Sequence, residues 1–175
     1  MDITITQALE KAYQGKKNQN AFAYESKNSW QTITWGEYRN SVKKMTEALY
    51  ALGFKKDDKI AIFSNNSYEW LIAHMAAIAA GGASAGIYPT VSCEQCFFII
   101  EHSQAKVLFI ENIEKLKILE PLLSKLSQLE TIVLMKQDET KHKTNGKITI
   151  FAWPEILSLS NQTTSEVYYS CIKKQ

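Results

Sequence analysis

The chain has 175 residues, 45% of them hydrophobic and 22% charged, with a mean hydropathy of -0.23. This composition is typical of a soluble globular protein, and the length favours one domain. The 20 basic and 18 acidic residues leave a net charge of +2, which gives no electrostatic footprint for nucleic acid or for an anionic membrane. No apolar run reaches the roughly 18 residues that span a bilayer, and the start lacks the order of a signal peptide, so we expect a cytoplasmic protein.

The first part of the chain reads as a helix, a hairpin and a second helix. The patterns predict, in order, a helix at 6–14 and paired strands at 21–24 and 30–33. Thr34 and Glu37 form a capping box that begins a second helix, in which apolar residues recur at helical spacing. Gly53 lies where the C-terminal cap of that helix is expected.

The middle of the chain alternates short apolar strands with helices. The expected strands are 59–63, 83–87, 106–110 and 131–135, and the expected helices are 68–80, 93–102 and one around Leu116 that Pro121 breaks or kinks. Such alternation predicts right-handed crossovers. The expected fold class is therefore α/β, with a three-layer, largely parallel, doubly wound sheet after an N-terminal helix and β-hairpin.

Capping residues set the expected helix ends in this region. Asn66 is predicted to cap the helix at 68–80, with Glu69 at its third position, and Gly81 and Gly82 to end it. Ser92, together with a glutamine three residues later, is predicted to cap the helix at 93–102. The alanine-rich helix at 68–80 is apolar on nearly every face, so we expect other elements to cover most of its sides.

The last part of the chain carries weaker patterns. Residues 136–147 read as a solvated loop, 148–151 as one further strand, and Pro154 suits the first turn of a helix. We therefore divide the chain into a leading helix and hairpin (1–34), a βαβ core (35–135), and a loop and connection (136–175).

A doubly wound sheet often binds a nucleotide through a phosphate-binding loop between a strand and a helix. The segment after the first core strand, 64–67, contains no glycine, which excludes a dinucleotide fingerprint there. The segment 162–165 has the hydroxyls of an anion-binding loop but neither glycine nor lysine, and a helix cap is the favoured interpretation.

Cysteine and histidine side chains give no clear site. Cys93 and Cys96 form a C-x-x-C without a second pair at zinc spacing, and with Cys171 the count is odd, so small buried thiols are favoured over a redox or metal role. His74 is predicted to be a core histidine bonded to the backbone, with a catalytic role as the alternative. His102 is expected at a helix C-terminus and His142 in solvent.

No catalytic triad, paired carboxylates or metal cluster stands out at an informative spacing. We therefore assign no catalytic residue and no metal ligand to this chain. From local chemistry alone, it is an α/β domain without a visible catalytic centre.

Several segments in order change that reading. The sequence ALYALGFKKDDKIAIF is followed by SNNSYEW, GGASAGIYPT and EHSQAKVLFIEN, all within 33–112. These resemble the segments "LxxLGxxxGDxVai", "sxNspEW", "aGgvxxgiYpT" and "ehSeakvvfve" of the adenylate-forming superfamily, and within it the long-chain acyl-CoA synthetases of the "bubblegum" type. One departure is Asp57, which stands where the family usually has glycine before the aspartate that here is Asp58.

The resemblance implies an N-terminal part of an AMP-binding domain. Complete family members use ATP, Mg²⁺ and coenzyme A to convert a fatty acid to acyl-CoA, with AMP and pyrophosphate as the other products. Adenylation needs a glycine-, serine- and threonine-rich loop with a lysine, and the resemblance places that loop after Gln175. We therefore expect no catalytic residue and no cofactor site within this chain, and no ligase activity of the chain alone.

The resemblance leaves one set of cleft-edge candidates. Tyr88, Pro89 and Thr90 follow a parallel strand, at the edge where such sheets bind ligands. They are candidates to approach the acyl or nucleotide cleft of a complete enzyme, and a purely structural turn is the alternative.

Three alternatives stay open for the chain as a whole. It is a truncated ligase, a non-enzymatic interaction or acyl-binding module, or one half of a split ligase that associates with the missing half or with a homologue. Family members often work at membrane surfaces, so a peripheral membrane location is the alternative to a freely cytoplasmic one.

Overall fold

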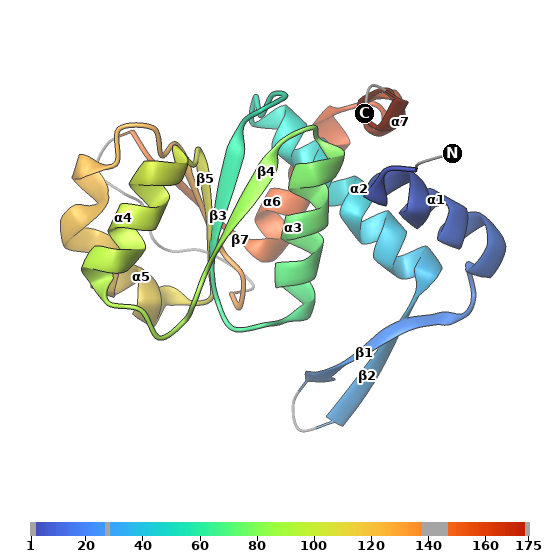
Figure 1. Cartoon of the computed structure of the whole chain (residues 1–175), viewed down its shortest axis with the longest axis horizontal. Coiled ribbons are helices and arrows are strands. Elements are labelled where there is room, and N and C mark those ends of the chain that lie inside the picture. Colours follow the sequence, from blue (N-terminus) through green and yellow to red (C-terminus); the bar gives the residue numbers. More distant parts are fainter. Residues whose placement is uncertain (1–2, 27–28, 138–146, 174–175) are drawn as a thin grey trace.

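The computed structural model describes residues 3–26, 29–137 and 147–173 and has an α/β architecture (Figure 1). Its helices are α1 (Ile5–Lys16), α2 (Trp35–Ala51), α3 (Tyr68–Ala79), α4 (Cys93–Ser103), α5 (Ile113–Leu119), α6 (Trp153–Ser158) and α7 (Ser165–Lys173), with 3-10 turns η1 (Glu120–Lys125) and η2 (Leu159–Gln162). Its strands are β1 (Asn20–Ser26), β2 (Ser29–Thr34), β3 (Lys59–Phe63), β4 (Ala83–Ile87), β5 (Val107–Ile110), β6 (Thr131–Leu134) and β7 (Thr149–Ala152).

Five strands form one parallel sheet in the order β4-β3-β5-β6-β7. Every residue of β5 and β6 is buried, as expected for parallel strands that are covered on both faces. β1 and β2 form a separate antiparallel hairpin, which extends away from the body of the molecule (Figure 1). The predicted α/β class, parallel sheet and leading hairpin are confirmed.

Helices cover both faces of the sheet. Side chains alternate along β3, so Ile60 and Ile62 join one core with α2, α3 and α6, while Ala61 and Phe63 join a second core with α4 and α5. Figure 1 shows α4 and α5 on one side of the sheet and α2, α3 and α6 on the other. The three-layer, doubly wound arrangement is therefore present.

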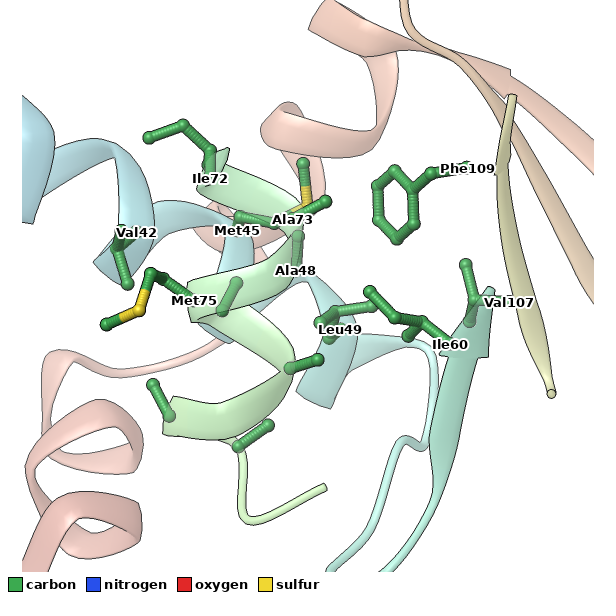
Figure 2. Packing of buried hydrophobic residues seen from close by; sticks show 14 of the residues in the cluster. Val42, Met45, Ala48, Leu49, Ile60, Ile72, Ala73, Met75, Val107 and Phe109 are labelled. Atoms are coloured by element: carbon green, nitrogen blue, oxygen red, sulfur yellow. The ribbon is translucent and has the colours of Figure 1, made fainter. Parts of the chain in front are cut away.

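α3 packs between α2 and the sheet (Figure 2). Val42, Met45 and Leu49 of α2 are fully buried, and so are Ile72 and Ala73 of α3. Small alanine side chains let the two helices approach closely, which follows from the composition of α3. One flank of α3 is only half-buried, and this flank becomes part of the candidate site.

The predicted helix caps are confirmed at Thr34, Ser92, Gly53 and Gly81, which follows α3 with a φ of +83°, and one predicted cap is wrong. Thr34 and Ser92 both make complete capping boxes, and Gly53 follows α2 with a φ of +84°. Asn66 does not cap α3, because Ser67 takes that place and its Oγ accepts a hydrogen bond from the backbone N–H of Trp70 at 3.2 Å. Both residue types are good caps, and the turn out of β3 decided between neighbouring positions.

Pro121 and Pro154 behave as predicted. α5 ends at Leu119, and the 3-10 turn η1 carries Pro121 near its start. Pro154 lies in the first turn of α6. The expected strand at 148–151 is present one residue later, as β7. Most of the loop predicted at 136–147 lies outside the described residues.

The edge at which the strands begin is closed by tight packing. Gly82 carries no side chain, and an added Cβ would lie 2.4 Å from the Asp58 carbonyl oxygen and 2.6 Å from the ring of Phe54. Lys106 donates to the Asp58 carboxylate at 2.9 Å across this edge. Asp57 has a φ of +68°, a left-handed conformation that favours glycine. The sequence departure at Asp57 therefore falls on a strained backbone position.

Candidate functional site

A hollow of about 400 Å³ opens at the opposite edge, where β3 and β4 end. Phe63 and Ile87 pair in register as the last residues of these strands, so the segments that follow them leave the sheet side by side. The residues that line the hollow are Ser64, Asn65, Asn66, Trp70, Gly86, Ile87, Tyr88 and Pro89. The carboxyl edge of a parallel sheet is where α/β proteins bind ligands.

The three cleft-edge candidates lie on the turn after β4. Tyr88 and Pro89 line the hollow, and the Tyr88 side chain is 80% exposed. Thr90 is exposed on the same turn but does not line the hollow. Lys115 of α5 donates to the Pro89 carbonyl oxygen at 3.2 Å, which fixes the turn against the neighbouring helix. Their participation in binding stays a prediction.

Trp70 and Gly86 form a wall of the hollow that the sequence reasoning missed. An added Cβ at Gly86 would lie 3.4 Å from Trp70 Cζ2, so the missing side chain leaves room for the indole. Trp70 lies one turn before His74 on α3, and the two rings stack with centroids 5.2 Å apart. The spacing of Trp70 and His74, one helical turn apart, indicates that they share a helix face, but no local pattern places that face against Gly86.

His74 is half-buried and differs from its predicted bonding. Its Nδ1 lies 2.6 Å from Ser84 Oγ on β4, so its partner is a side-chain hydroxyl and the predicted backbone bond is wrong. Burial lowers the pKa of His74 below its usual value, which favours the neutral ring at neutral pH. The residue braces Trp70 against β4 without lining the hollow itself.

Charged groups near the hollow are paired with one another. Asn65 donates to both carboxylate oxygens of Glu111 at 3.0 and 3.2 Å, and Lys115 lies 3.5 Å from the same carboxylate. Lys136 pairs with Glu69 at 2.8 Å. Among the residues that the structure describes, no charged side chain lines the hollow itself. The described lining is therefore uncharged, and it includes two asparagines, Trp70 and Tyr88.

Two of the cysteines, Cys93 and Cys96, have thiols with raised pKa values. Cys96 is buried, and burial raises the pKa of its thiol to about 12. Burial, with the nearby Glu94, also raises the pKa of Cys93, whose Sγ lies 3.1 Å from the Ile118 carbonyl oxygen. Thiols with raised pKa values are poor nucleophiles and metal ligands. Among the described residues, no group of three His, Cys, Asp or Glu side chains is placed to hold a metal ion.

The remaining sequence candidates lie elsewhere. His102 is in the last turn of α4, as predicted, and stacks on Phe98 with centroids 5.5 Å apart. The hydroxyl-rich segment 162–165 runs from η2 into the first residue of α7, and its capping role stays a prediction. His142 lies outside the described residues. No helix of the described ranges is long and apolar enough to cross a bilayer.

Curated relatives of the chain are long-chain-fatty-acid–CoA ligases. Ligase ACSBG2 of Rattus norvegicus is 29% identical over 160 residues, which cover 91% of this chain and 23% of the relative. Ligase ACSBG1 of the same organism is 24% identical over 175 residues, which cover 100% of this chain and 24% of the relative. The chain therefore spans about a quarter of the length of these relatives.

Solved structures show the same fold. The anthranilate CoA ligase AuaEII, in complex with anthranoyl-AMP, matches 74% of this chain with a TM-score of 0.66 and 22% identity, over 24% of its own length. Coronafacic acid ligase from Pectobacterium brasiliense matches 87% of this chain with a TM-score of 0.74 and 18% identity, over 29% of its own length. The sequence model of the family described as "AMP-binding enzyme" matches residues 9–164. The chain thus belongs to the AMP-binding enzyme family and is homologous to long-chain-fatty-acid–CoA ligases.

Proposed function

We propose that this chain supplies the first strands of the AMP-binding domain of a long-chain-fatty-acid–CoA ligase. The observation that carries the proposal is the match to ACSBG2 over 91% of the chain. The complete enzyme would use a fatty acid, ATP, Mg²⁺ and coenzyme A to make acyl-CoA, AMP and pyrophosphate. Within that enzyme, the chain would act in the cytoplasm or at a membrane surface where long-chain acyl groups reside.

The hollow at the ends of β3 and β4 is the part of the chain that we assign to the substrate cleft. Tyr88, Pro89 and Thr90 are its proposed edge. Its position at the carboxyl edge supports this role, and so does its uncharged surface between aromatic rings. The paired state of Glu111 and Lys115 leaves neither as a free charge for catalysis. We therefore propose that this region positions a substrate and performs no chemical step.

The chain by itself is proposed to be inactive as a ligase. Transfer of AMP to a carboxylate builds negative charge on phosphate oxygens, which backbone N–H groups, a lysine and Mg²⁺ must offset. The 175 residues contain no glycine-rich loop with a lysine, and no described residue that lines the hollow is cationic. We therefore propose that the described part of the chain does not hold the triphosphate in line with a fatty-acid carboxylate.

A chimera tests the proposal. The 160 matched residues of rat ACSBG2 would be replaced by the corresponding residues of this chain, and fatty-acid-dependent exchange of pyrophosphate into ATP would be measured. The chimera is expected to catalyse exchange, whereas the 175-residue chain alone is expected to give none. A folded chimera without exchange would contradict the assignment to the cleft, and exchange by the chain alone would contradict its proposed inactivity.

Two related measurements, exchange in a mixture and fatty-acid binding, separate the alternatives. A split ligase predicts that exchange appears when the chain is mixed with an ACSBG2 lacking the matched residues. An acyl-binding or interaction module predicts saturable fatty-acid binding by the chain alone, without turnover in any mixture. The chimera with Tyr88→Ala is expected to lose about tenfold in kcat/KM, the usual scale for a substrate-positioning contact, and Tyr88→Phe to lose little.

A further inference from the structure

Arg39 of α2 is buried far from the hollow and pairs with α1. Its side chain is 4% exposed, and its Nε donates to Glu10 Oε1 at 2.7 Å. Its Nη2 donates to the second carboxylate oxygen of Glu10 at 3.2 Å, so the pair is bidentate. A buried guanidinium of this kind is costly unless several partners satisfy it.

α7 supplies further partners from the other end of the chain. Nη2 of Arg39 also donates to the Tyr169 hydroxyl at 2.7 Å, and the Tyr168 hydroxyl donates to Glu10 Oε1 at 2.9 Å. The guanidinium carbon lies 5.0 Å from the ring centroid of Tyr168 and 5.3 Å from that of Tyr169. Tyr13 of α1 adds a third ring, at 4.7 Å. These five residues are called the Arg39 latch.

The Arg39–Glu10 pair therefore connects α1 and α7, which are separated by most of the sequence. If α7 undocked from α2, the Arg39–Glu10 pair would lose two hydroxyl partners and two aromatic faces. If α1 undocked from α2, the Arg39 guanidinium would lie under α7 without the Glu10 carboxylate. Undocking of either helix therefore weakens the contacts that hold the other one, because the members of a buried polar network strengthen one another.

Apolar burial beneath α7 is limited, which makes the latch important to its docking. Only Tyr168 and Ile172 are buried among the α7 side chains that the structure describes. Tyr169 is 45% exposed and reaches the latch through its hydroxyl. Elements with few buried contacts open locally at low free energy.

We propose that the Arg39 latch makes α1 and α7 dock on α2 as one cooperative unit. The two end helices open and close together, while the sheet and its other covering helices stay folded. The latch is thus a conformational device that couples the beginning of the described chain to its end.

Amide hydrogen exchange on the full 175-residue chain tests the coupling. Tyr168→Phe removes one hydroxyl from α7, and Glu10→Gln removes the carboxylate charge from α1. Each variant is expected to speed exchange about tenfold in both 5–16 and 167–173, since losing a hydrogen bond to a charged group has that scale. Exchange in α4, on the opposite face of the sheet, should stay unchanged.

Tyr13→Phe is the matched control, because its ring faces Arg39 and no described hydrogen bond uses its hydroxyl. It should leave exchange unchanged in all three segments. Arg39→Lys, which cannot keep a bidentate pair, should loosen both end helices further. If Arg39→Lys fails to fold, the two peripheral variants still decide the question. Faster exchange in only the substituted helix would overturn the proposal, and so would an equal increase in α4.

Discussion

The two edges of the parallel sheet differ in how they are closed. Where the strands begin, Gly82 touches the Asp58 backbone, and Lys106 pairs with the carboxylate of the same residue. Where β3 and β4 end, a hollow of about 400 Å³ remains beside an exposed Tyr88. The first edge is filled by packing, and the second is left open. In one sheet, tight packing and open space thus lie at opposite ends of the same strands.

Filling the closed edge should have the largest effect. Gly82→Ala places a Cβ 2.4 Å from a backbone oxygen, which cannot move as a flexible side chain can. We expect a loss of about 3 kcal/mol in the free energy of unfolding, measured by urea denaturation.

Gly15→Ala is the control for that substitution, because no atom lies within 4 Å of its added Cβ in α1. It should stabilise the protein by up to about 1 kcal/mol through helix propensity. Equal effects of the two substitutions would show that the closed edge is not tightly packed.

Relieving the strain at the same edge should have a smaller effect of opposite sign. Asp57→Gly removes a Cβ from a backbone with a φ of +68° and should stabilise the protein by about 0.5–1 kcal/mol. Gly53→Ala makes the reverse change at a φ of +84° and should destabilise it by about 1 kcal/mol. Urea denaturation measures both, and a destabilised Asp57→Gly would contradict this account of the turn.

His74, which stacks on Trp70, should make the free energy of unfolding depend weakly on pH. The folded state lowers the pKa of His74 through burial, so the unfolded chain binds a proton more readily. Its contribution is therefore present above the unfolded pKa of about 6.5 and is lost as pH falls through the folded value. His74→Gln should flatten the pH dependence of the thermal midpoint in that window. An unchanged slope would mean that other groups cause it.

Changing the open edge should have the smallest effect on stability. Tyr88 is 80% exposed, so Tyr88→Ala should change the free energy of unfolding by less than about 0.5 kcal/mol. Tyr50→Ala, at an exposed position on α2, is the control and should behave alike. A large loss of stability for Tyr88→Ala alone would mean that the turn after β4 is structural, which is the alternative to a role in binding.

Local patterns predicted much of the fold and little of the site. The capping boxes at Thr34 and Ser92, the helix break at Pro121 and the helix start at Pro154 follow from chemistry within four residues, and they are confirmed. The cap of α3 was misplaced from Ser67 to Asn66, because two adjacent residues compete and only the exit from β3 selects one. The wall made by Trp70 and Gly86 depends on a helix and a strand meeting, and no local pattern encodes that contact.

The sequence by itself determined the alternation of strands and helices, the family resemblance and the uncommon residue at Asp57. These depend on periodicity, on caps and on ordered segments, all of which are local properties. Only the tertiary structure decided which strands lie at the sheet edges, that the described lining of the hollow carries no charge, and that Arg39 joins α1 to α7. These features depend on side chains from distant segments sharing one space, and burial then sets which charges must be paired.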